Sequence, residues 1–226
     1  MKFRRIGLTR PGGRMLVQNW MSTPVITVEA GQPVAEAVRL LGENGIKRLP
    51  VMDAGRLVGI LSEKDLRALT LPLKPLDDQM LREAQSVTAG EVMTPQPVTI
   101  GPDQPVEAAA VKLHDNHFGC LPVANEAGTL VGIITEDDVF EAMIAMTGAR
   151  FPGVRISLEI EDKPGSIKEV TDVVRAEGGK IISIVTSYQG VRAGYRELIL
   201  KISGDQAHHI VGRLSDAYPG TTVVRI

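Results

Sequence analysis

Apolar residues recur with helical spacing in two stretches of the chain that lie 72 positions apart. Each stretch places apolar side chains at i, i+3, i+4 and i+7, which predicts an amphipathic helix. The two stripes are Val34, Ala37, Val38 and Leu41, and then Val106, Ala109, Ala110 and Leu113. A proline precedes each stripe, Pro33 or Pro105, and proline is well suited to the first turn of a helix. The chain therefore contains two copies of the same helical element.

The repeat extends well beyond these helices. Residues 21–53 match residues 93–125 at an offset of 72, and the offset becomes 73 after the turn, where NEAG replaces DAG. Each copy continues through LPV and LVGI to a segment that reads Ser or Thr, Glu, any residue, Asp. These apolar runs and turns predict a strand, a helix, two strands and a second helix in each copy. The predicted unit is β-α-β-β-α, and it occurs twice.

After Gly148 the periodicity changes and a second domain is expected. Apolar and polar residues alternate over 154–161, which predicts a half-buried strand. A helix stripe follows (Ile167, Val170, Val173 and Val174) and ends at Gly178-Gly179. Two strands over 180–188 and 195–203, a helix stripe (Ala207, Ile210, Val211 and Leu214) and a closing strand over 221–226 complete the pattern. The order βαββαβ is that of a ferredoxin-like domain.

The duplicated unit resembles the CBS domain, and two in tandem resemble a CBS pair, or Bateman module. The βαββαβ segment, with its Asp-Lys-Pro-Gly turn at 162–165, resembles an ACT domain, and the combination resembles the acetoin-utilisation regulator type of CBS-ACT protein. The resemblance implies an α+β protein in which the repeats form a pseudo-symmetric pair. The expected divisions are a basic, flexible N-terminal arm (1–14), CBS repeat 1 (15–70), a connection (71–89) with a helical stretch (77–84), CBS repeat 2 (90–148), a linker (149–153) and the ACT domain (154–226).

Composition narrows the class of protein. The net charge of −2 over 226 residues, 23% of them charged, gives no support for binding to nucleic acid or to an anionic membrane. No apolar run reaches the roughly 18 residues of a membrane span, and the basic start lacks the apolar region of a secretory signal. The one cysteine, Cys120, is expected to be a small buried hydrophobe and not a nucleophile. We expect a cytoplasmic protein.

The CBS resemblance implies clefts that bind adenine nucleotides. In that family the closing Asp accepts hydrogen bonds from ribose hydroxyls, and the Ser or Thr hydroxyl faces phosphate. The nucleotide-binding residues expected by position are Thr27, Lys47, Arg48, Gly59, Ser62, Asp65, Thr99, Gly132, Thr135 and Asp138. The expected ligand is AMP, ADP, ATP or another adenosine derivative. In the alternative interpretation Ser62 and Thr135 only cap helices.

The repeats differ at one informative place. Lys47 and Arg48 align with Gly119 and Cys120, so we expect the two cations to be missing from one cleft. The alternative is that both are solvated charges at a strand end. In the ACT domain, the resemblance implies amino-acid binding at Asp162, Pro164, Gly165 and Ser166, against the alternative of a capped turn.

Catalytic chemistry is not indicated by the sequence. The two histidines at i, i+3, His114 and His117, lack the further ligands of a metal site, and the chain contains no phosphate-binding loop, dinucleotide fingerprint or catalytic triad pattern. Met143 and Met146 suggest either a partner-binding face or packing in the core or a dimer. We expect a non-catalytic sensor that forms a homodimer through both domains and modulates an unknown target protein. The alternative is an enzyme, or the detached regulatory subunit of one, and for it the family resemblance implies acetoin catabolism as the pathway.

Overall fold

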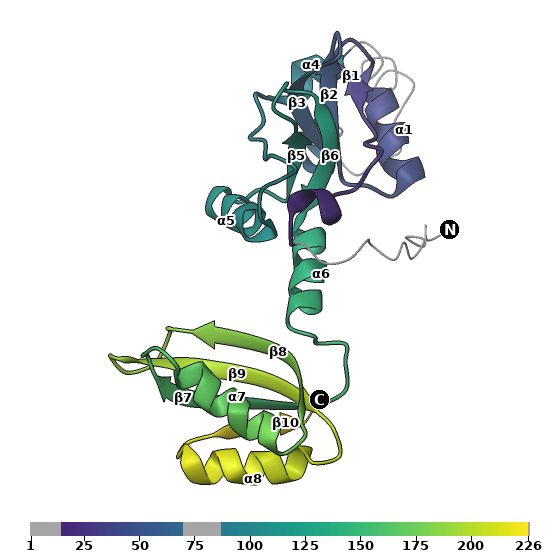
Figure 1. Ribbon diagram of the computed structural model, residues 1–226. Helices are drawn as coiled ribbons and strands as arrows, with labels where there is room; N and C mark the ends of the chain where they lie inside the picture. Colours follow the sequence, from purple (N-terminus) through teal and green to yellow (C-terminus); the bar gives the residue numbers. More distant parts are fainter. Residues whose placement is uncertain (1–14, 70–86, 226) are drawn as a thin grey trace. The chain divides into compact units, whose positions relative to one another are not determined.

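A computed structural model describes residues 15–69 and 87–225 (Figure 1). The predicted α+β class is confirmed, and the chain divides into two compact units, 1–140 and 141–226. The predicted N-terminal arm (1–14), and all of the connection that was predicted as helical (77–84), lie outside the described residues. We describe each unit separately.

The first repeat builds a four-stranded sheet in the order β1-β2-β3-β4. After a short 3-10 helix, η1 (Val17–Asn19), its elements are β1 (Val28–Glu29), α1 (Val34–Asn44), β2 (Arg48–Asp53), β3 (Arg56–Ser62) and α2 (Glu63–Leu69). Strand β1 pairs parallel to β2, and β2 pairs antiparallel to β3. Apolar residues from the sheet and α1, including Leu49, Val51 and Leu61, are fully buried and form the core of this repeat.

The second repeat follows the same order. Its elements are α4 (Ala89–Val92), β4 (Thr94–Pro95), α5 (Val106–Asn116), β5 (Cys120–Ala124), β6 (Leu130–Thr135) and α6 (Glu136–Met146). Ile100 forms a parallel bridge with Val123, at the place that β1 occupies in the first repeat. Its core is built around Leu121, Val123 and Ile134, each fully buried.

The two repeats exchange their opening segments. Strand β4 belongs by sequence to the second repeat, but it pairs with β3 of the first, with Thr94 opposite Ile60. In the same way Ser22 of the first repeat pairs with Ile133 of the second, with backbone hydrogen bonds of 2.8 and 3.1 Å. Each repeat therefore completes the sheet of the other.

One apolar position was predicted incorrectly. In α1, Val34, Ala37 and Leu41 are buried, but Val38, which shares their stripe in the sequence, is 48% exposed. A stripe at this spacing is wider than the strip of helix that the sheet covers, so the residue at its edge faces solvent. Met143 and Met146 on α6 are also exposed, at 50% and 41%. The interpretation that these two residues pack in the core is therefore wrong for the described chain.

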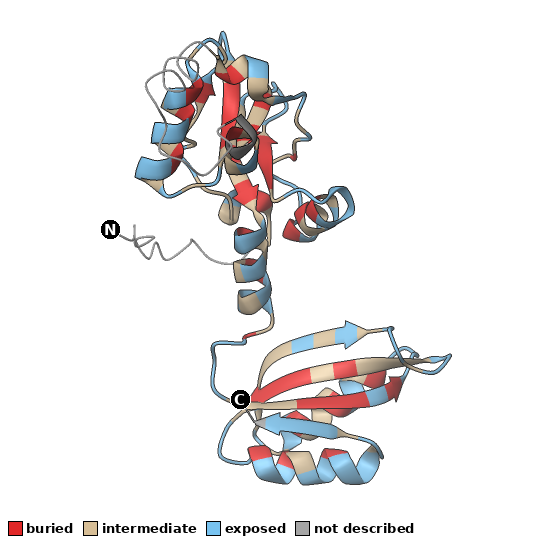
Figure 2. Cartoon of the chain, turned by 180° about the vertical axis from the view of Figure 1, so that it is seen from behind, coloured by how far each residue is buried: buried red, intermediate tan, exposed pale blue. Residues whose placement is uncertain are grey.

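Residues 154–225 have the predicted βαββαβ order. Its elements are β7 (Val154–Glu161), α7 (Ser166–Ala176), β8 (Lys180–Ser187), β9 (Tyr195–Ser203), α8 (Ala207–Ala217) and β10 (Thr222–Arg225). The antiparallel sheet has the order β10-β7-β9-β8. Its apolar face packs against both helices, and Figure 2 shows the buried residues concentrated on the central strands. The core contains, from strands and helices alike, Ile156, Leu158, Ile160, Val170, Val174, Leu198, Leu200, Ile202, Ile210 and Leu214.

The segment that precedes β7 is hydrogen-bonded to the sheet of this second unit. The ammonium group of Lys201, which is 3% exposed, donates to the Ala149 carbonyl at 3.2 Å. The Ser183 hydroxyl donates to the Thr147 carbonyl at 2.8 Å. A β-carbon at Gly153 would lie 2.5 Å from the Ile202 carbonyl oxygen, so glycine permits this close approach. The linker is thus part of the second unit.

Candidate functional site

The second helix of each repeat begins with a reciprocal capping arrangement. At the first, the Asp65 carboxylate accepts from the Ser62 backbone amide at 2.8 Å and from the Ser62 hydroxyl at 2.6 Å. The Asp65 amide donates back to the Ser62 hydroxyl at 3.3 Å. Thr135 and Asp138 repeat this geometry, with distances of 2.9, 2.6 and 3.3 Å. The capping role considered for Ser62 and Thr135 is confirmed, and each Asp belongs to the same cap.

The two aspartates differ in their access to solvent. Asp65 is half-buried and lines a cavity, whereas Asp138 is 0% exposed and does not line the equivalent cavity. Both hydrogen bonds to Asp65 reach one oxygen, Oδ2, and within the described residues its Oδ1 receives no hydrogen bond. Asp65 therefore has an acceptor available to a ligand.

The first cleft, a cavity of about 410 Å³, combines residues from both repeats. The first repeat supplies the capping turn and the second supplies the strand-exchange segment and the end of α5. Its lining is Lys47, Arg48, Ile60, Ser62, Glu63, Lys64, Asp65, Thr94, Gln96, Pro97, Val98, His117, Phe118, Gly119, Cys120 and Pro122. The apolar side chains among these provide a surface for a flat ring, and the charged ones lie on the capping turn and at the start of β2.

The second cleft, a cavity of about 350 Å³, also combines residues from both repeats, but each repeat supplies the part that the other supplies to the first cleft. Here the capping turn comes from the second repeat and the exchanged segment from the first. Its lining is Ser22, Pro24, Val25, Ile26, Gly45, Ile46, Lys47, Arg48, Gly119, Ile133, Thr135, Glu136 and Asp137. The exchanged segments, 94–98 and 22–26, were not identified as binding residues from the sequence. The two segments are equivalent at the offset of 72, and this equivalence is the signal in the sequence that could have identified them.

Lys47 and Arg48 line both clefts. The expectation that one cleft would lack these cations is therefore wrong. Alignment of the repeats shows where a residue lies within its own repeat, but not which cavities it reaches. The start of β2 lies between the two cavities, so its side chains line both. The guanidinium of Arg48 lies directly over Gly119, where an added β-carbon would be 1.7 Å from Nη2. Glycine in the second repeat thus leaves the space that the arginine of the first repeat occupies.

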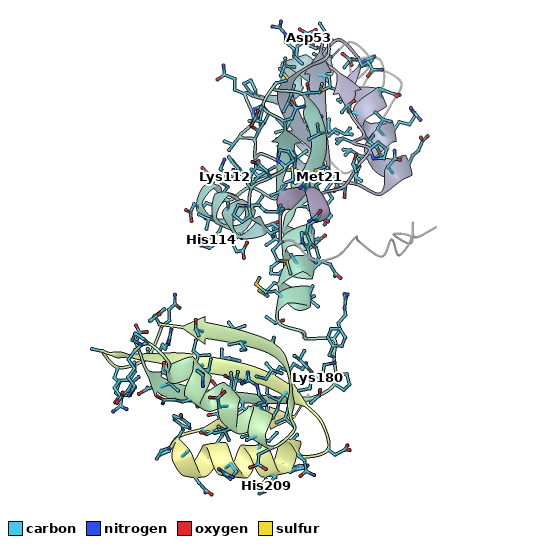
Figure 3. All side chains as sticks on the ribbon, viewed as in Figure 1. Met21, Asp53, Lys112, His114, Lys180 and His209 are labelled. Atoms are coloured by element: carbon cyan, nitrogen blue, oxygen red, sulfur yellow. The ribbon has the colours of Figure 1, made fainter. Side chains whose placement is uncertain are left out.

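Four other predicted residues lie away from the two cavity linings. Gly59 and Gly132 are contact points between the repeats, because an added β-carbon would lie 2.2 Å from the sulfur of Met93 or of Met21, respectively. Figure 3 labels Met21, beside the second repeat. Thr27 lines a different cavity of about 350 Å³, together with Glu29 and Met52, among others. Thr99 lines neither cleft, and its carbonyl accepts from the Lys112 ammonium at 3.0 Å.

Cys120 is a buried thiol at the edge of the first cleft. It is 5% exposed, and burial raises the pKa of the thiol from its ordinary value of 9.0 to about 11. The charge of Arg48 acts in the opposite direction, and that of Glu136 adds to the increase in this pKa. The thiolate is the reactive form of cysteine, so the expectation of a small buried hydrophobe is confirmed.

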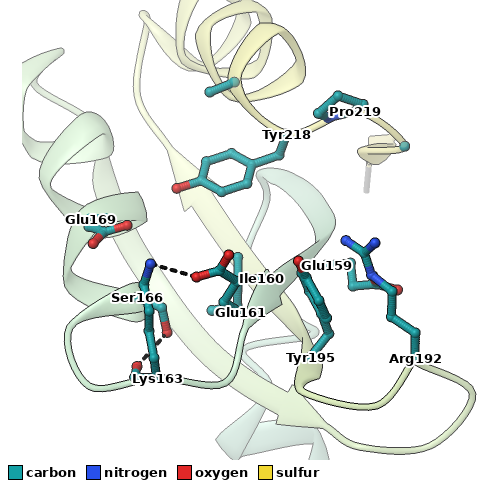
Figure 4. Close-up of a pocket in the computed structure, with 12 residues that line it drawn as sticks. Glu159, Ile160, Glu161, Lys163, Ser166, Glu169, Arg192, Tyr195, Tyr218 and Pro219 are labelled. Carbon is teal, nitrogen blue, oxygen red and sulfur yellow. Dashed lines mark hydrogen bonds and ion pairs between the residues drawn. The ribbon is translucent and has the colours of Figure 1, made fainter.

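The second unit contains a cavity of about 740 Å³ where the ends of β7 and α8 meet the start of α7 (Figure 4). The Arg192 guanidinium lies 3.5 Å from the centre of the Tyr195 ring and 2.5 Å from the Glu159 carboxylate. Tyr218 faces the same space, and burial raises the pKa of its hydroxyl, with a further contribution from the negative charge of Glu169. The cavity therefore offers aromatic, cationic and anionic groups together.

The predicted amino-acid residues lie beside this cavity. Asp162, Pro164 and Gly165 line a smaller cavity of about 430 Å³, and Ser166 lines the larger one. The Ser166 hydroxyl donates to the Lys163 carbonyl at 3.0 Å and accepts from Arg196 at 3.0 Å. This turn is thus internally hydrogen-bonded, and its hydroxyl orients Arg196.

Comparison with known families finds the CBS domain at residues 17–71 and 89–145, and the TTHA0829-like ACT domain at residues 152–225. These matches confirm both resemblances drawn from the sequence. A CBS domain-containing protein of Dictyostelium discoideum is 33% identical over 134 residues, which cover 58% of this chain and 92% of that protein. An inosine-5′-monophosphate dehydrogenase of Korarchaeum cryptofilum is 32% identical over 123 residues, 54% of this chain and 23% of the enzyme.

Solved structures agree with this assignment. The CBS-pair protein CBSX2 from Arabidopsis thaliana is 30% identical, with a TM-score of 0.52 over 58% of this chain and 96% of that chain. A candidate acetoin utilization protein (AcuB) from Vibrio cholerae is 25% identical, with a TM-score of 0.51 over 61% and 96%. Within the described residues, no helix is long and apolar enough to cross a membrane.

Proposed function

Because this chain belongs to the CBS-domain proteins and ends in an ACT domain, we propose that it is a cytoplasmic regulatory sensor of an adenosine-containing ligand. In this proposal the CBS clefts bind AMP, ADP, ATP or a related adenosine derivative. Binding alters the association of the chain with a target protein, and the chain itself performs no catalysis.

The proposal rests on charged groups that line the first cleft and have no partner within the described residues. No carboxylate in the described part of the chain forms an ion pair with Lys47, Arg48 or Lys64, although all three line this cavity. Asp65 lines the same cavity, and its Oδ1 receives no hydrogen bond from the described residues. Unpaired cations beside an available carboxylate oxygen suit a ligand that has both phosphate and hydroxyl groups.

We assign the ribose hydroxyls to Asp65 and the phosphates to Lys47, Arg48 and Lys64. The adenine ring is assigned to the apolar part of the lining, beside Val98 and Phe118. Flat rings gain stability by displacing water from such surfaces. The other predicted residues on the cavities, Ser62 and Thr135, hold the two capping turns in place.

Thermal unfolding of the full chain with and without ligand tests this function. A ligand that binds only the native state at about 100 times its Kd stabilises the protein by roughly 2.7 kcal/mol. We expect adenosine phosphates to raise the melting temperature and guanosine phosphates, as matched controls of equal charge, to raise it much less. Equal shifts with both bases would mean that the clefts bind phosphate alone, and the absence of any shift would refute the proposal.

At the ACT domain we propose that an amino acid binds beside the turn formed by Asp162, Pro164, Gly165 and Ser166. The charged groups around it, Lys163 and Arg196 among them, support binding of a small zwitterion. We also propose that the chain is a homodimer through the CBS pair and the ACT domain. Large apolar side chains exposed on α6 (Phe140, Met143 and Met146) support this.

A second function is supported by the relatives. The matched part of this chain corresponds to 23% of the Korarchaeum dehydrogenase, so in that enzyme a similar segment belongs to a larger catalytic protein. This chain could act in trans as a detached regulatory subunit of an enzyme, with acetoin catabolism as one pathway to test. Affinity purification of the tagged chain distinguishes the two, because a regulatory subunit retains one enzyme in a fixed ratio.

A further inference from the structure

The start of β2 presents two cations to two cavities at once. Lys47 and Arg48 line both clefts, and the Arg48 guanidinium lies over Gly119, which itself lines both. Because Gly119 is the counterpart of Lys47 in the second repeat, the pair of repeats carries one such cation pair where symmetry would give two. A single guanidinium can make its close bidentate contact with one phosphate group at a time.

The remaining charges of the two clefts are unequal. Without the shared pair, the first cleft has one cation, Lys64, beside Glu63 and Asp65. The second cleft has Glu136 and Asp137, and the described residues add no further lysine or arginine to its lining. Asp137 is the counterpart of Lys64 at the offset of 73, so the repeats place opposite charges at the same position of their capping turns.

We propose that Arg48 is a shared phosphate-binding residue that makes the two clefts unequal. The first cleft binds a phosphorylated adenosine ligand, and the second then favours an uncharged adenosine ligand. When Arg48 turns towards the first cleft, the second keeps Glu136 and Asp137 with weaker compensation, and these carboxylates repel a second phosphorylated ligand. The inference rests on the proposed function, and it adds a rule for which ligand each cleft takes.

Calorimetric titration of the full chain with adenosine and with ATP, at one ionic strength, tests this rule. The quantity to compare is the ratio between the second and the first dissociation constant for each ligand. Adenosine gives the intrinsic difference between the clefts, and we expect the ratio for ATP to exceed it by about tenfold or more. Added salt should reduce this excess, because the opposing charges are exposed to solvent.

Three variants separate the shared cation from other causes. Arg48→Gln should weaken the first ATP site by about ten- to a hundredfold, leave adenosine binding unchanged and reduce the excess of the ATP ratio over the adenosine ratio. Arg56→Gln is the matched control, because Arg56 is an exposed arginine at the opposite end of the same pair of strands. Asp137→Lys gives the second cleft a cation of its own and should strengthen the second ATP site without changing the first.

The outcomes are distinct. Equal ratios for ATP and adenosine in the unmodified chain, or an unchanged ATP ratio in a folded Arg48→Gln protein, would overturn the shared-cation proposal while leaving nucleotide binding intact. A chain that binds neither adenosine nor ATP would overturn the proposed function, and with it this inference. An ATP ratio that falls in Arg48→Gln and in Asp137→Lys, but not in Arg56→Gln, supports it.

Discussion

Replacing Asp65 with asparagine separates ligand binding from helix capping. The Asp65 carboxylate accepts the hydrogen bonds of the cap through Oδ2, whereas its Oδ1 receives no hydrogen bond from the described residues, and the residue lines the first cleft. Asparagine keeps one acceptor oxygen, which can still receive the Ser62 amide, but it has no negative charge. The variant should therefore fold and lose the charge-assisted contact that we assign to ribose.

The expected magnitudes follow from these contacts. Weakening one cap should cost about 0.5–2 kcal/mol of unfolding free energy. Losing a hydrogen bond to a charged acceptor should cost roughly 1.5–3 kcal/mol of binding free energy, or about ten- to a hundredfold in Kd. Binding should thus suffer more than stability, even though one carboxylate serves both.

Asp138→Asn is the matched control. It alters the equivalent cap of the second repeat, which has the same 2.6 Å hydroxyl contact, but the Asp138 carboxylate is fully buried and the residue does not line the second cleft. We expect this variant to lose at least as much stability as Asp65→Asn and to bind at the first cleft within about a factor of two of the unmodified chain. Calorimetry with adenosine, paired with denaturant unfolding of each protein, gives both quantities. If folded Asp65→Asn binds as tightly as the unmodified chain, the assignment of Asp65 to ribose is refuted.

Three further predictions concern other parts of the chain. Light scattering of the full chain at micromolar concentration should give twice the mass of one chain, and a monomer would contradict the homodimer. Cys120 should resist iodoacetamide at pH 8 until the protein unfolds. Burial raises the pKa of this thiol from 9.0 to about 11, so the unfolded state loses the proton first as pH rises. The free energy of unfolding should therefore fall between pH 9 and 11, and Cys120→Ala should remove this part of the pH dependence. Lys201→Met leaves the Ala149 carbonyl without its donor at 3.2 Å. If nucleotide and amino acid change each other's affinity, with a coupling free energy of about 1–3 kcal/mol, this variant should reduce that free energy. A coupling free energy that is unchanged in Lys201→Met would mean that this contact does not contribute to it.

Periodicity in the sequence was sufficient for most elements of the fold. The strand predicted over 154–161 and the helix stripe at 167–174 match β7 and α7, because each buries one face against a core within its own domain. The capping turns were also evident, since Ser62 and Asp65 interact over three residues of sequence. Structural features that depend on residues close together in the chain can thus be predicted from a single sequence.

The exchange between repeats could not be predicted in this way. Strand β4 is two residues long, too short for any alternation to show, and its partner Ile60 lies 34 positions before Thr94. For the same reason the sequence assigned Lys47 and Arg48 to one cleft. Which cavity a side chain reaches depends on the packing of the repeats against each other, and an alignment of one repeat on the other contains no information about that packing.

The strand exchange has a consequence for how a signal could leave the clefts. A ligand in the first cleft contacts the capping turn of one repeat, at Asp65, and the exchanged segment of the other, at 94–98. Its binding free energy therefore adds directly to the free energy that holds the repeats together, because the site exists only when they are associated. The repeats also meet where Met93 lies on Gly59 and Met21 on Gly132, contacts that leave no room for a side chain. A small change in the separation or rotation of the repeats would disturb these tight contacts and both clefts together. Ligand binding is thus expected to act on the arrangement of the two repeats, and a target protein that contacts both repeats would detect it.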